Sequence, residues 1–336
     1  MFLPLLYAVF LFVISDDKLS AFRSLAGYTT VAFVPIVFYY ILKNYFYLFV
    51  KFLKFTTITY FIVGVIQIVY DRNFFSFILN RISTTDTRGI TSLTVEPTFY
   101  GIVCLFLILI FISLNIKDKN KYIYLLLFQI IFLAQSSMTI LFLLVFGFYY
   151  FLFKLNIKTV SISILFILFI VLLLSNIEIS SYNLRVIDLA NKFIEKPTSI
   201  FIADASINDR VSAIYFSIKG FFDNYGIVNG FGTYSTYLEN QLQKQDTFWW
   251  VSVSNRIMSY YGGVFFELGF IGLLIPVIYS VNIIKAYRYD IKSGFLYLFF
   301  IHSILMTAIP LSFPLVGVYI ATLLYKAKHE TLNNPQ

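Results

Sequence analysis

Charged residues are scarce in this chain. Asp, Glu, Lys and Arg make up 12% of its 336 residues, against 59% hydrophobic and 20% aromatic residues. A soluble domain carries about 25% charged residues. The low charge, together with a mean hydropathy of +0.82, excludes an ordinary soluble domain. Hydrophobic runs recur along almost the whole length, which predicts a membrane protein that crosses the bilayer many times.

Cysteine is almost absent. The single cysteine, Cys104, lies inside an apolar run and cannot form an internal disulfide. A cleavable signal peptide is not recognisable either, because the first apolar run, from Phe2 to Ile14, has no basic flank and no small-residue cleavage site. We therefore expect this run to be retained as a span. The sequence leaves open whether another span precedes it.

The long apolar runs predict an all-α fold, a polytopic bundle of about ten transmembrane helices. A crossing needs about 17 to 25 apolar residues, and tilt tolerates shorter or longer runs. The run 122–153 is too long for one helix and is divided at 134–139, and a later run is divided at Pro310 and Pro314, because proline removes a backbone donor. The predicted spans are 2–15, 25–42, 52–70, 95–115, 121–135, 137–154, 159–177, 260–284, 294–309 and 311–326.

Basic residues are unevenly distributed among the connections. Those at 43–54, 117–121, 154–158, 285–292 and 326–330 carry thirteen Lys and Arg against three Asp and Glu, and the rest of the chain carries twelve against fourteen. Cytoplasmic loops are enriched in Lys and Arg, so we expect both termini in the cytoplasm. The pI of about 9.2 follows from this topology and does not indicate a nucleic-acid partner. The isoleucine-rich, alanine-poor composition is typical of an AT-rich bacterial genome.

The spans divide the chain into three predicted parts. They are an N-terminal transmembrane bundle of about seven spans (1–177), a large periplasmic or extracellular loop (178–259), and C-terminal spans with a cytoplasmic tail (260–336). We expect the functional site on the external face, in this loop and the 71–94 connection, because loops held by a rigid bundle carry most sites.

Apolar residues recur at helical spacing near the middle of the large loop. They predict an amphipathic helix over 207–222, with Asn208 or Ser206 as its N-cap. Arg210 falls in the first turn, near the border of the apolar stripe. We expect the helix to lie against either the bundle or the lipid surface. The stripe consists of Val211, Ile214, Tyr215, Ile218 and Phe222.

Three glycines follow this helix: Gly226, Gly230 and Gly232. Glycine adopts positive φ without strain and lets the backbone approach a ligand closely. A glycine turn beside an arginine is therefore suited to holding a pyrophosphate through backbone N–H groups. An ordinary turn is the alternative reading, and the residues alone leave both open.

Several short motifs occur in a fixed order. This arrangement resembles the superfamily of O-antigen polymerases and ligases, the Wzy-type polysaccharide polymerases, over roughly residues 20 to 325. The motifs are Arg-Gly…Glu-Pro-Thr (88–98), Ser-Ser-Met-Thr (136–139), Asn-Asp-Arg (208–210), Gly-Phe-Gly (230–232), Ser-Asn-Arg (254–256) and the glycine-rich segment 261–273, which contains Glu267.

The resemblance implies a metal-independent glycosyltransferase of lipopolysaccharide or surface-polysaccharide biosynthesis, on the outer side of the bacterial cytoplasmic (inner) membrane. The donor is a growing glycan on undecaprenyl pyrophosphate, and the acceptor is the terminal sugar of a new lipid-linked repeat unit. The implied partners are this lipid-linked oligosaccharide, the lipid bilayer and a chain-length regulator protein. No nucleotide sugar, metal or other cofactor is implied, and the only acid pair, Asp16-Asp17, is adjacent rather than spaced as Asp-x-Asp.

The same resemblance implies roles for individual residues. Glu96 and Arg210 are the expected catalytic residues. Arginine suits a leaving pyrophosphate because its planar guanidinium offers paired donors. For most arginines on the external side, a solvated surface position is the alternative. The residues expected to bind substrate or pyrophosphate are Arg88, Arg210, Arg256, Gly230, Gly232, Asn255 and Tyr234.

Glu96 permits two interpretations. An acid and a proline, Pro97, are both favourable in the first turn of a helix. Alternatively, the carboxylate accepts the proton of the acceptor hydroxyl or orients the sugar. Glu267, deeper in a predicted span, is expected to be structural or to line the site.

Two departures from the family pattern bear on the activity. Ligases carry a histidine near the position of Ser254-Asn255, whereas His302 and His329 lie elsewhere. This absence favours a polymerase over the main alternative, an O-antigen ligase. Many relatives also carry an arginine where this chain has Met138-Thr139. The further alternatives are a flippase for lipid-linked oligosaccharide, for which no internal repeat is visible, and a non-catalytic assembly scaffold.

Overall fold

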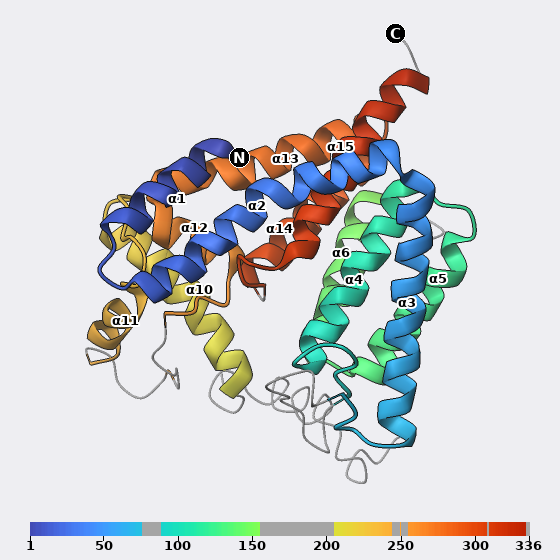
Figure 1. The fold of residues 1–336 in the computed structure, drawn as a ribbon, viewed down its shortest axis with the longest axis horizontal. Helices are drawn as coiled ribbons and strands as arrows, with labels where there is room; N and C mark the ends of the chain where they lie inside the picture. Colours follow the sequence, from blue (N-terminus) through green and yellow to red (C-terminus); the bar gives the residue numbers. More distant parts are fainter. Residues whose placement is uncertain (76–88, 155–204, 244–248, 250–254, 308, 334–336) are drawn as a thin grey trace. The chain divides into compact units, whose positions relative to one another are not determined.

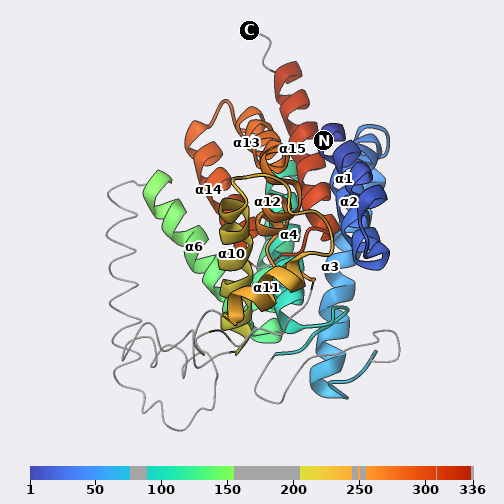
Figure 2. The same ribbon diagram turned by 90° about the vertical axis from the view of Figure 1, so that its left-hand side faces the viewer.

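The computed structural model describes residues 1–75, 89–154, 205–243, 249, 255–307 and 309–333, and Figures 1 and 2 show its ribbon from two directions. The regular secondary structure in these ranges is entirely helical, as predicted. The chain forms two compact units, which are described separately. Unit 1 comprises Met1–Tyr40 and Lys192–Gln336, and unit 2 comprises Ile41–Asn191.

Unit 1 combines the N-terminal helices with the C-terminal ones. α13 packs against α14 and α15, and α12 packs against α10 and α14. Gly317 lies directly against Val34, which brings α15 next to α2. The helices are α1 (Phe2–Ile14), α2 (Lys18–Asn44, which continues into unit 2), α10 (Ala205–Asp223), α11 (Tyr234–Leu242), α12 (Tyr260–Leu268), the 3-10 helix η3 (Gly269–Leu273), α13 (Leu274–Ala286), α14 (Ile291–Thr307) and α15 (Pro314–Asn333).

Unit 2 is built around one buried helix. α4 contacts α3, α5 and α6 (Figure 1), and its side chains are buried from Tyr100 to Phe111. An unbroken apolar run suits this position, because every face of the helix meets protein. The helices are α3 (Phe46–Val69), α4 (Pro97–Leu114), α5 (Lys119–Phe128), the π-helix η1 (Gln129–Ala134) and α6 (Ser137–Lys154).

Several helices are suited to a lipid bilayer, so the chain is a membrane protein. The segments long and apolar enough to cross are Lys18–Asn44, Phe46–Val69, Pro97–Leu114 and Tyr260–Ala286. Shorter apolar helices are Phe2–Ile14, Ser137–Phe153 and Ile291–Thr307. Each predicted span contains a helix except 159–177, which lies outside the described residues.

Both predicted span breaks are present. The π-helix ends at Ala134, Gln135 adopts a left-handed conformation with φ of 43°, and α6 begins at Ser137. The second break separates α14 from α15, and Pro314 is the first residue of the latter, where proline needs no hydrogen-bond partner for its nitrogen.

The helix predicted at 207–222 is present as α10, but the predicted caps are wrong. The helix begins at Ala205, so Ser206 and Asn208 lie inside it. The face that packs on α12 is also not the predicted apolar stripe, because Tyr215 and Phe222 are exposed. The bundle-facing side carries Asn208, Ser212, Ala213, Phe216, Ser217, Gly220 and Phe221, all of them buried.

Small residues explain this choice of face. Gly262 of α12 is too close to the Ser217 hydroxyl to accommodate a side chain, and Gly220 lies in the same way against the Phe266 ring. Helices in membrane proteins associate through small residues because the backbones can then approach closely.

Candidate functional site

The glycine turn joins the end of α10 to the break after α12. Gly226, Gly230 and Gly232 have φ of 73°, 84° and 75°, which confirms the predicted left-handed backbone. The Phe270 N–H donates to the Gly226 carbonyl at 2.9 Å. Gly269, with φ of 58°, lies too close to this carbonyl for any side chain. Backbone contact therefore accounts for Gly226 and Gly269.

The other two glycines differ in their surroundings. A Cβ at Gly232 would lie 3.1 Å from the Asp17 Cβ and 3.6 Å from the Ser20 Cβ, whereas Gly230 has no atom within 4 Å of such a position. The Ser15 hydroxyl also donates to the Phe231 carbonyl at 3.3 Å. The turn is thus attached to the start of α2, and the open side of its backbone is at Gly230.

Asn255 links three segments within unit 1. Its side-chain oxygen accepts from the Ser235 N–H at 2.8 Å, and its side-chain nitrogen donates to the Ser20 hydroxyl at 3.3 Å. Asp17 accepts from the Ser20 N–H at 3.1 Å. Together with Gly232, these four residues form what we call the Asn255 cluster. It brings the predicted residues Asn255 and Gly232 to the same place.

Arginines lie beside this cluster. Arg256 follows Asn255 and is exposed, and Arg23 is exposed on α2. Hydrogen bonds from the Ser20 hydroxyl and N–H lower the pKa of the Asp17 carboxyl below its ordinary value, and the positive charge of Arg23 adds to this effect. Asp17 therefore stays ionised under ordinary conditions and contributes a negative charge near Arg23.

Arg210 occupies the second turn of α10 and is half-buried. Burial raises the pKa of the Tyr234 phenol, and the negative charge of Asp209, the residue before Arg210, adds to this effect. The start of α10 and the residue after the glycine turn thus share one electrostatic environment.

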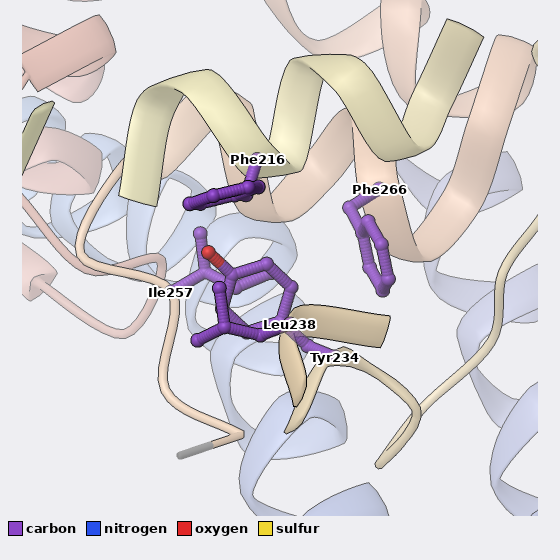
Figure 3. Packing of buried hydrophobic residues seen from close by; sticks show 5 residues of the cluster. All are labelled: Phe216, Tyr234, Leu238, Ile257 and Phe266. Carbon is purple, nitrogen blue, oxygen red and sulfur yellow. The ribbon is translucent and has the colours of Figure 1, made fainter. Parts of the chain in front are cut away.

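Tyr234 packs in the core beneath α10. Figure 3 shows its ring among Phe216, Leu238, Ile257 and Phe266, with the hydroxyl directed toward Phe216 and Ile257. This hydroxyl is buried and has no hydrogen-bond partner within the described ranges. The predicted sugar-contacting residue therefore contributes mainly packing in this arrangement.

Polar side chains connect α10 to α11. Lys219 pairs with the Asp223 carboxylate at 2.6 Å and donates to the Gln241 side-chain oxygen at 3.1 Å. The Tyr237 hydroxyl donates to the same carboxylate at 2.7 Å, and burial with this interaction raises the pKa of Tyr237. These bonds fix α11, and therefore the glycine turn before it, against α10.

Glu267 lies within the apolar segment Tyr260–Ala286. Its carboxylate accepts from the Ser24 hydroxyl at 2.6 Å and the Tyr28 hydroxyl at 2.8 Å, both from α2. The Tyr28 ring stacks on Phe231 of the glycine turn, with ring centroids 5.8 Å apart. Glu267 is therefore held by hydrogen bonds inside unit 1, as its cost in an apolar environment requires.

In unit 2, Glu96 occupies the N-cap position of α4, and Pro97 is the first helical residue, as predicted. The Glu96 side chain is half-buried and makes no capping bond. Its backbone carbonyl accepts from the Thr94 hydroxyl at 2.8 Å and from the Tyr100 N–H at 3.2 Å. The backbone of Glu96 thus helps to fix the start of α4.

Two predicted motifs meet in unit 2. The Ser136 hydroxyl donates to the Thr98 hydroxyl oxygen at 3.2 Å, which joins the segment 136–139 to the segment 88–98. The Ile90 N–H donates to the Leu133 carbonyl in the π-helix at 2.9 Å. Gly101 lies too close to Thr139 for a side chain.

Gln67 of α3 holds the same segment from the other side. Its side-chain oxygen accepts from the Ser92 N–H at 2.6 Å, and its nitrogen donates to the Ser92 carbonyl at 3.0 Å and the Phe74 carbonyl at 3.0 Å. Gln67 and Ser92 are fully buried, and Ser92 has φ of 49°. Gln67 therefore fixes the backbone that leads to Glu96.

The structure thus gathers the candidates into two groups, one in each unit. Arg88 lies outside the described residues. Asp17, Ser20 and Arg23 were missed as members of the site, because the predicted span began at 25 whereas α2 begins at Lys18. A signal existed: an Asp just before a helical segment is an N-cap pattern, because its carboxylate accepts from a backbone N–H two or three residues later, here that of Ser20.

Within the described ranges, no group of three or more His, Cys, Asp and Glu side chains is arranged to hold a metal ion. Comparisons with family models, with curated proteins and with solved structures find no match to this chain.

Proposed function

We propose that this chain polymerises O-antigen or a related surface polysaccharide. It transfers the growing glycan from undecaprenyl pyrophosphate to the terminal sugar of a new lipid-linked repeat unit. One observation supports this proposal: residues of several motifs on which the resemblance rests lie close together within each unit. In unit 2 the Ser136 hydroxyl donates to the Thr98 hydroxyl oxygen, and in unit 1 the Asn255 side chain accepts from the Ser235 N–H, three residues after Gly-Phe-Gly.

The proposed transfer forms one bond and breaks one. The acceptor hydroxyl oxygen bonds to the anomeric carbon of the donor glycan, and the bond from that carbon to the pyrophosphate oxygen breaks. The pyrophosphate leaves with the bonding electron pair, and a base takes the hydroxyl proton. The step needs positive charge at the leaving group and a carboxylate at the acceptor.

The chain supplies both kinds of group. We infer that Arg210 stabilises the leaving pyrophosphate during transfer and that Arg256 and Arg88 bind it before transfer. The turn has open space at Gly230, where a side chain would otherwise lie, and we infer that an anion approaches the backbone there. Glu96 acts as the base, a role supported by the half-buried position of its side chain at the start of α4. No metal takes part in this scheme.

We further infer a topology of ten spans in the bacterial cytoplasmic membrane. The four long apolar helices support the spans, and the concentration of Lys and Arg in five connections supports cytoplasmic termini. In this orientation the 178–259 segment and the proposed active site face outward, where lipid-linked repeat units are polymerised. A chain-length regulator is the proposed protein partner.

Deletion of the gene tests the activity. A polymerase defect leaves single repeat units attached to the cell surface and removes the long chains, which gel electrophoresis of the surface polysaccharide resolves. Loss of all attached units with accumulation of long lipid-linked polymer would instead identify a ligase. Loss of the attached units and of the long lipid-linked polymer, with repeat units retained on the cytoplasmic side, would identify a flippase.

Arg210→Ala is expected to give single-unit product at normal protein level, because the leaving pyrophosphate then lacks the planar cation that stabilises it. Arg210→Lys should restore part of the chain length, since it keeps the charge but not the paired donors. The matched control is Arg288→Ala, an exposed arginine in the basic connection 285–292, which should leave chain length unchanged. Chains of ordinary length from Arg210→Ala would remove this residue from the mechanism.

Glu96→Gln keeps the size of the side chain and removes its charge. If Glu96 is the base, polymer length falls to single units while the protein still accumulates in the membrane. Thr94→Ala, which changes a hydroxyl bonded to the Glu96 backbone but leaves the carboxylate, is the control. Full polymerisation by Glu96→Gln would favour the purely structural interpretation of Glu96.

A further inference from the structure

Large apolar side chains are exposed where α10 ends and the glycine turn begins. Phe222 is 68% exposed, Tyr225 85%, Ile227 60% and Phe270 61%. We call these four residues the apolar ledge. A contiguous group of exposed apolar side chains on a folded protein generally marks a surface that another apolar phase covers.

The ledge is rigidly connected to the apolar segment Tyr260–Ala286. Phe270 of η3 donates its N–H to the Gly226 carbonyl at 2.9 Å, and its ring meets the Phe221 ring edge-on with centroids 5.4 Å apart. The turn therefore cannot shift without breaking its contacts to η3, which is part of this apolar segment.

A second exposed apolar surface lies on α13, the helix that directly follows η3. Its exposed residues recur at helical spacing, which is the pattern of a single stripe. This stripe belongs to a segment that is long and apolar enough to cross a membrane, so its outward face meets lipid. The exposed residues are Leu274, Val277, Val281 and Ile284.

We propose that the apolar ledge inserts into the hydrocarbon boundary of the bilayer, so that the end of α10 and the glycine turn lie at lipid level and not in water. The amino acids fit such a position, because Tyr225 combines an apolar ring with a polar hydroxyl, as interfacial aromatic residues do. The neighbouring Lys219–Asp223 ion pair is part-exposed and suits the polar headgroup side of the same helix.

This placement explains why the predicted stripe of α10 does not face the bundle. The bundle side uses Ser217 and Gly220, whereas Phe222 is left outward. It also places Asn255 and Gly230 close to the membrane surface, because Gly230 belongs to the glycine turn and Asn255 is bonded to Ser235 just after it. The inference concerns this surface alone and holds whether or not the chain is a polymerase.

Spin labels test the proposal. Single cysteines replace Phe222, Tyr225 or Ile227 in the full chain, and Glu239→Cys and Asn240→Cys serve as controls on the exposed side of α11. Cys104 is fully buried, so the parent chain should remain unlabelled. The labelled proteins are placed in phosphatidylethanolamine–phosphatidylglycerol nanodiscs without isoprenoid lipid, and collisions with oxygen and with a water-soluble nickel chelate are compared.

Labels at the three ledge positions should collide preferentially with oxygen, and labels at 239 and 240 with the nickel chelate. Ledge labels that behave like those at 239 and 240 would overturn the proposal. Protection from both reagents would also overturn it, since a second copy or another protein segment would then cover the ledge. Phe270→Cys provides a separate test from the η3 side if a label at the turn disturbs folding, which gel filtration detects.

Discussion

At the scale of single residues, the glycines divide by what surrounds them. Gly269 and Gly230 both have positive φ, but only Gly269 faces a backbone carbonyl at a distance that excludes a side chain. The sequence predicts positive φ for glycines in the turn, because glycine alone adopts it freely. It does not reveal which glycine also needs the space of its missing side chain.

Gly269→Ala should therefore destabilise the protein far more than Gly230→Ala. The second substitution costs only the left-handed conformation, about 1–2 kcal/mol, whereas the first adds a clash with the Gly226 carbonyl. The midpoint of thermal unfolding in detergent measures both. Equal midpoints for the two variants would contradict the backbone contact at Gly269.

Gln67 offers a second test at this scale. Gln67→Leu should lower stability by several kcal/mol, because it leaves the buried N–H and carbonyl of Ser92 unpaired at about 1–3 kcal/mol each. Gln243→Leu, at an exposed position, is the control. If both variants unfold at the same temperature, the hydrogen bonds of Gln67 contribute nothing to the fold.

At the scale of elements, helix positions follow from the sequence but helix faces do not. The apolar runs predict the helices, the break at 134–139 and the start at Pro97, because hydrophobic length and proline act locally. The inward face of α10 was not predictable from its apolar stripe. In a membrane protein both lipid and core are apolar, so hydrophobicity does not distinguish them, and small residues such as Ser217 and Gly220 mark the packed side.

The candidate site was predictable to a similar extent. Asn255 and Gly232 were identified from motifs. That both lie next to Ser20 of α2 is visible only in the fold. The hydrogen bonds from Ser24 and Tyr28 to Glu267 were equally inaccessible, because they join residues more than 230 positions apart.

Packing of α10 gives a prediction at this scale. Gly220→Leu should displace α10 from α12, because the added side chain meets the Phe266 ring, and overpacking of this kind costs about 1–3 kcal/mol. Phe222→Leu, two residues away on the exposed side, should be nearly neutral. Thermal unfolding and protease sensitivity of the loop report the difference, and a neutral Gly220→Leu would refute the packed face assigned to α10.

At the scale of the whole molecule, the proposed orientation rests on charge. Asn120 lies in a basic connection and Asn240 lies in the segment proposed to face outward, and both are exposed. The proposed orientation places Asn120 in the cytoplasm and Asn240 outside the cell, whatever reaction the chain catalyses.

In intact cells, a membrane-impermeant thiol reagent should therefore label Asn240→Cys and should label Asn120→Cys only after the membrane is permeabilised. Cys104 is buried and serves as the internal blank. The reverse labelling pattern would invert the topology and remove the external active site.

The junction between the glycine turn and η3 has a consequence for the history of such a chain. Its bonds run from backbone to backbone, Phe270 N–H to the Gly226 carbonyl and Asn229 N–H to the Phe266 carbonyl. The Asn229 side chain adds a bond to the Phe266 carbonyl, and Gly226 and Gly269 leave no room for a side chain, so the junction constrains these three residues more than the apolar side chains around it. Descendants of one ancestor can therefore exchange most of the surrounding apolar side chains while keeping these few residues at fixed intervals.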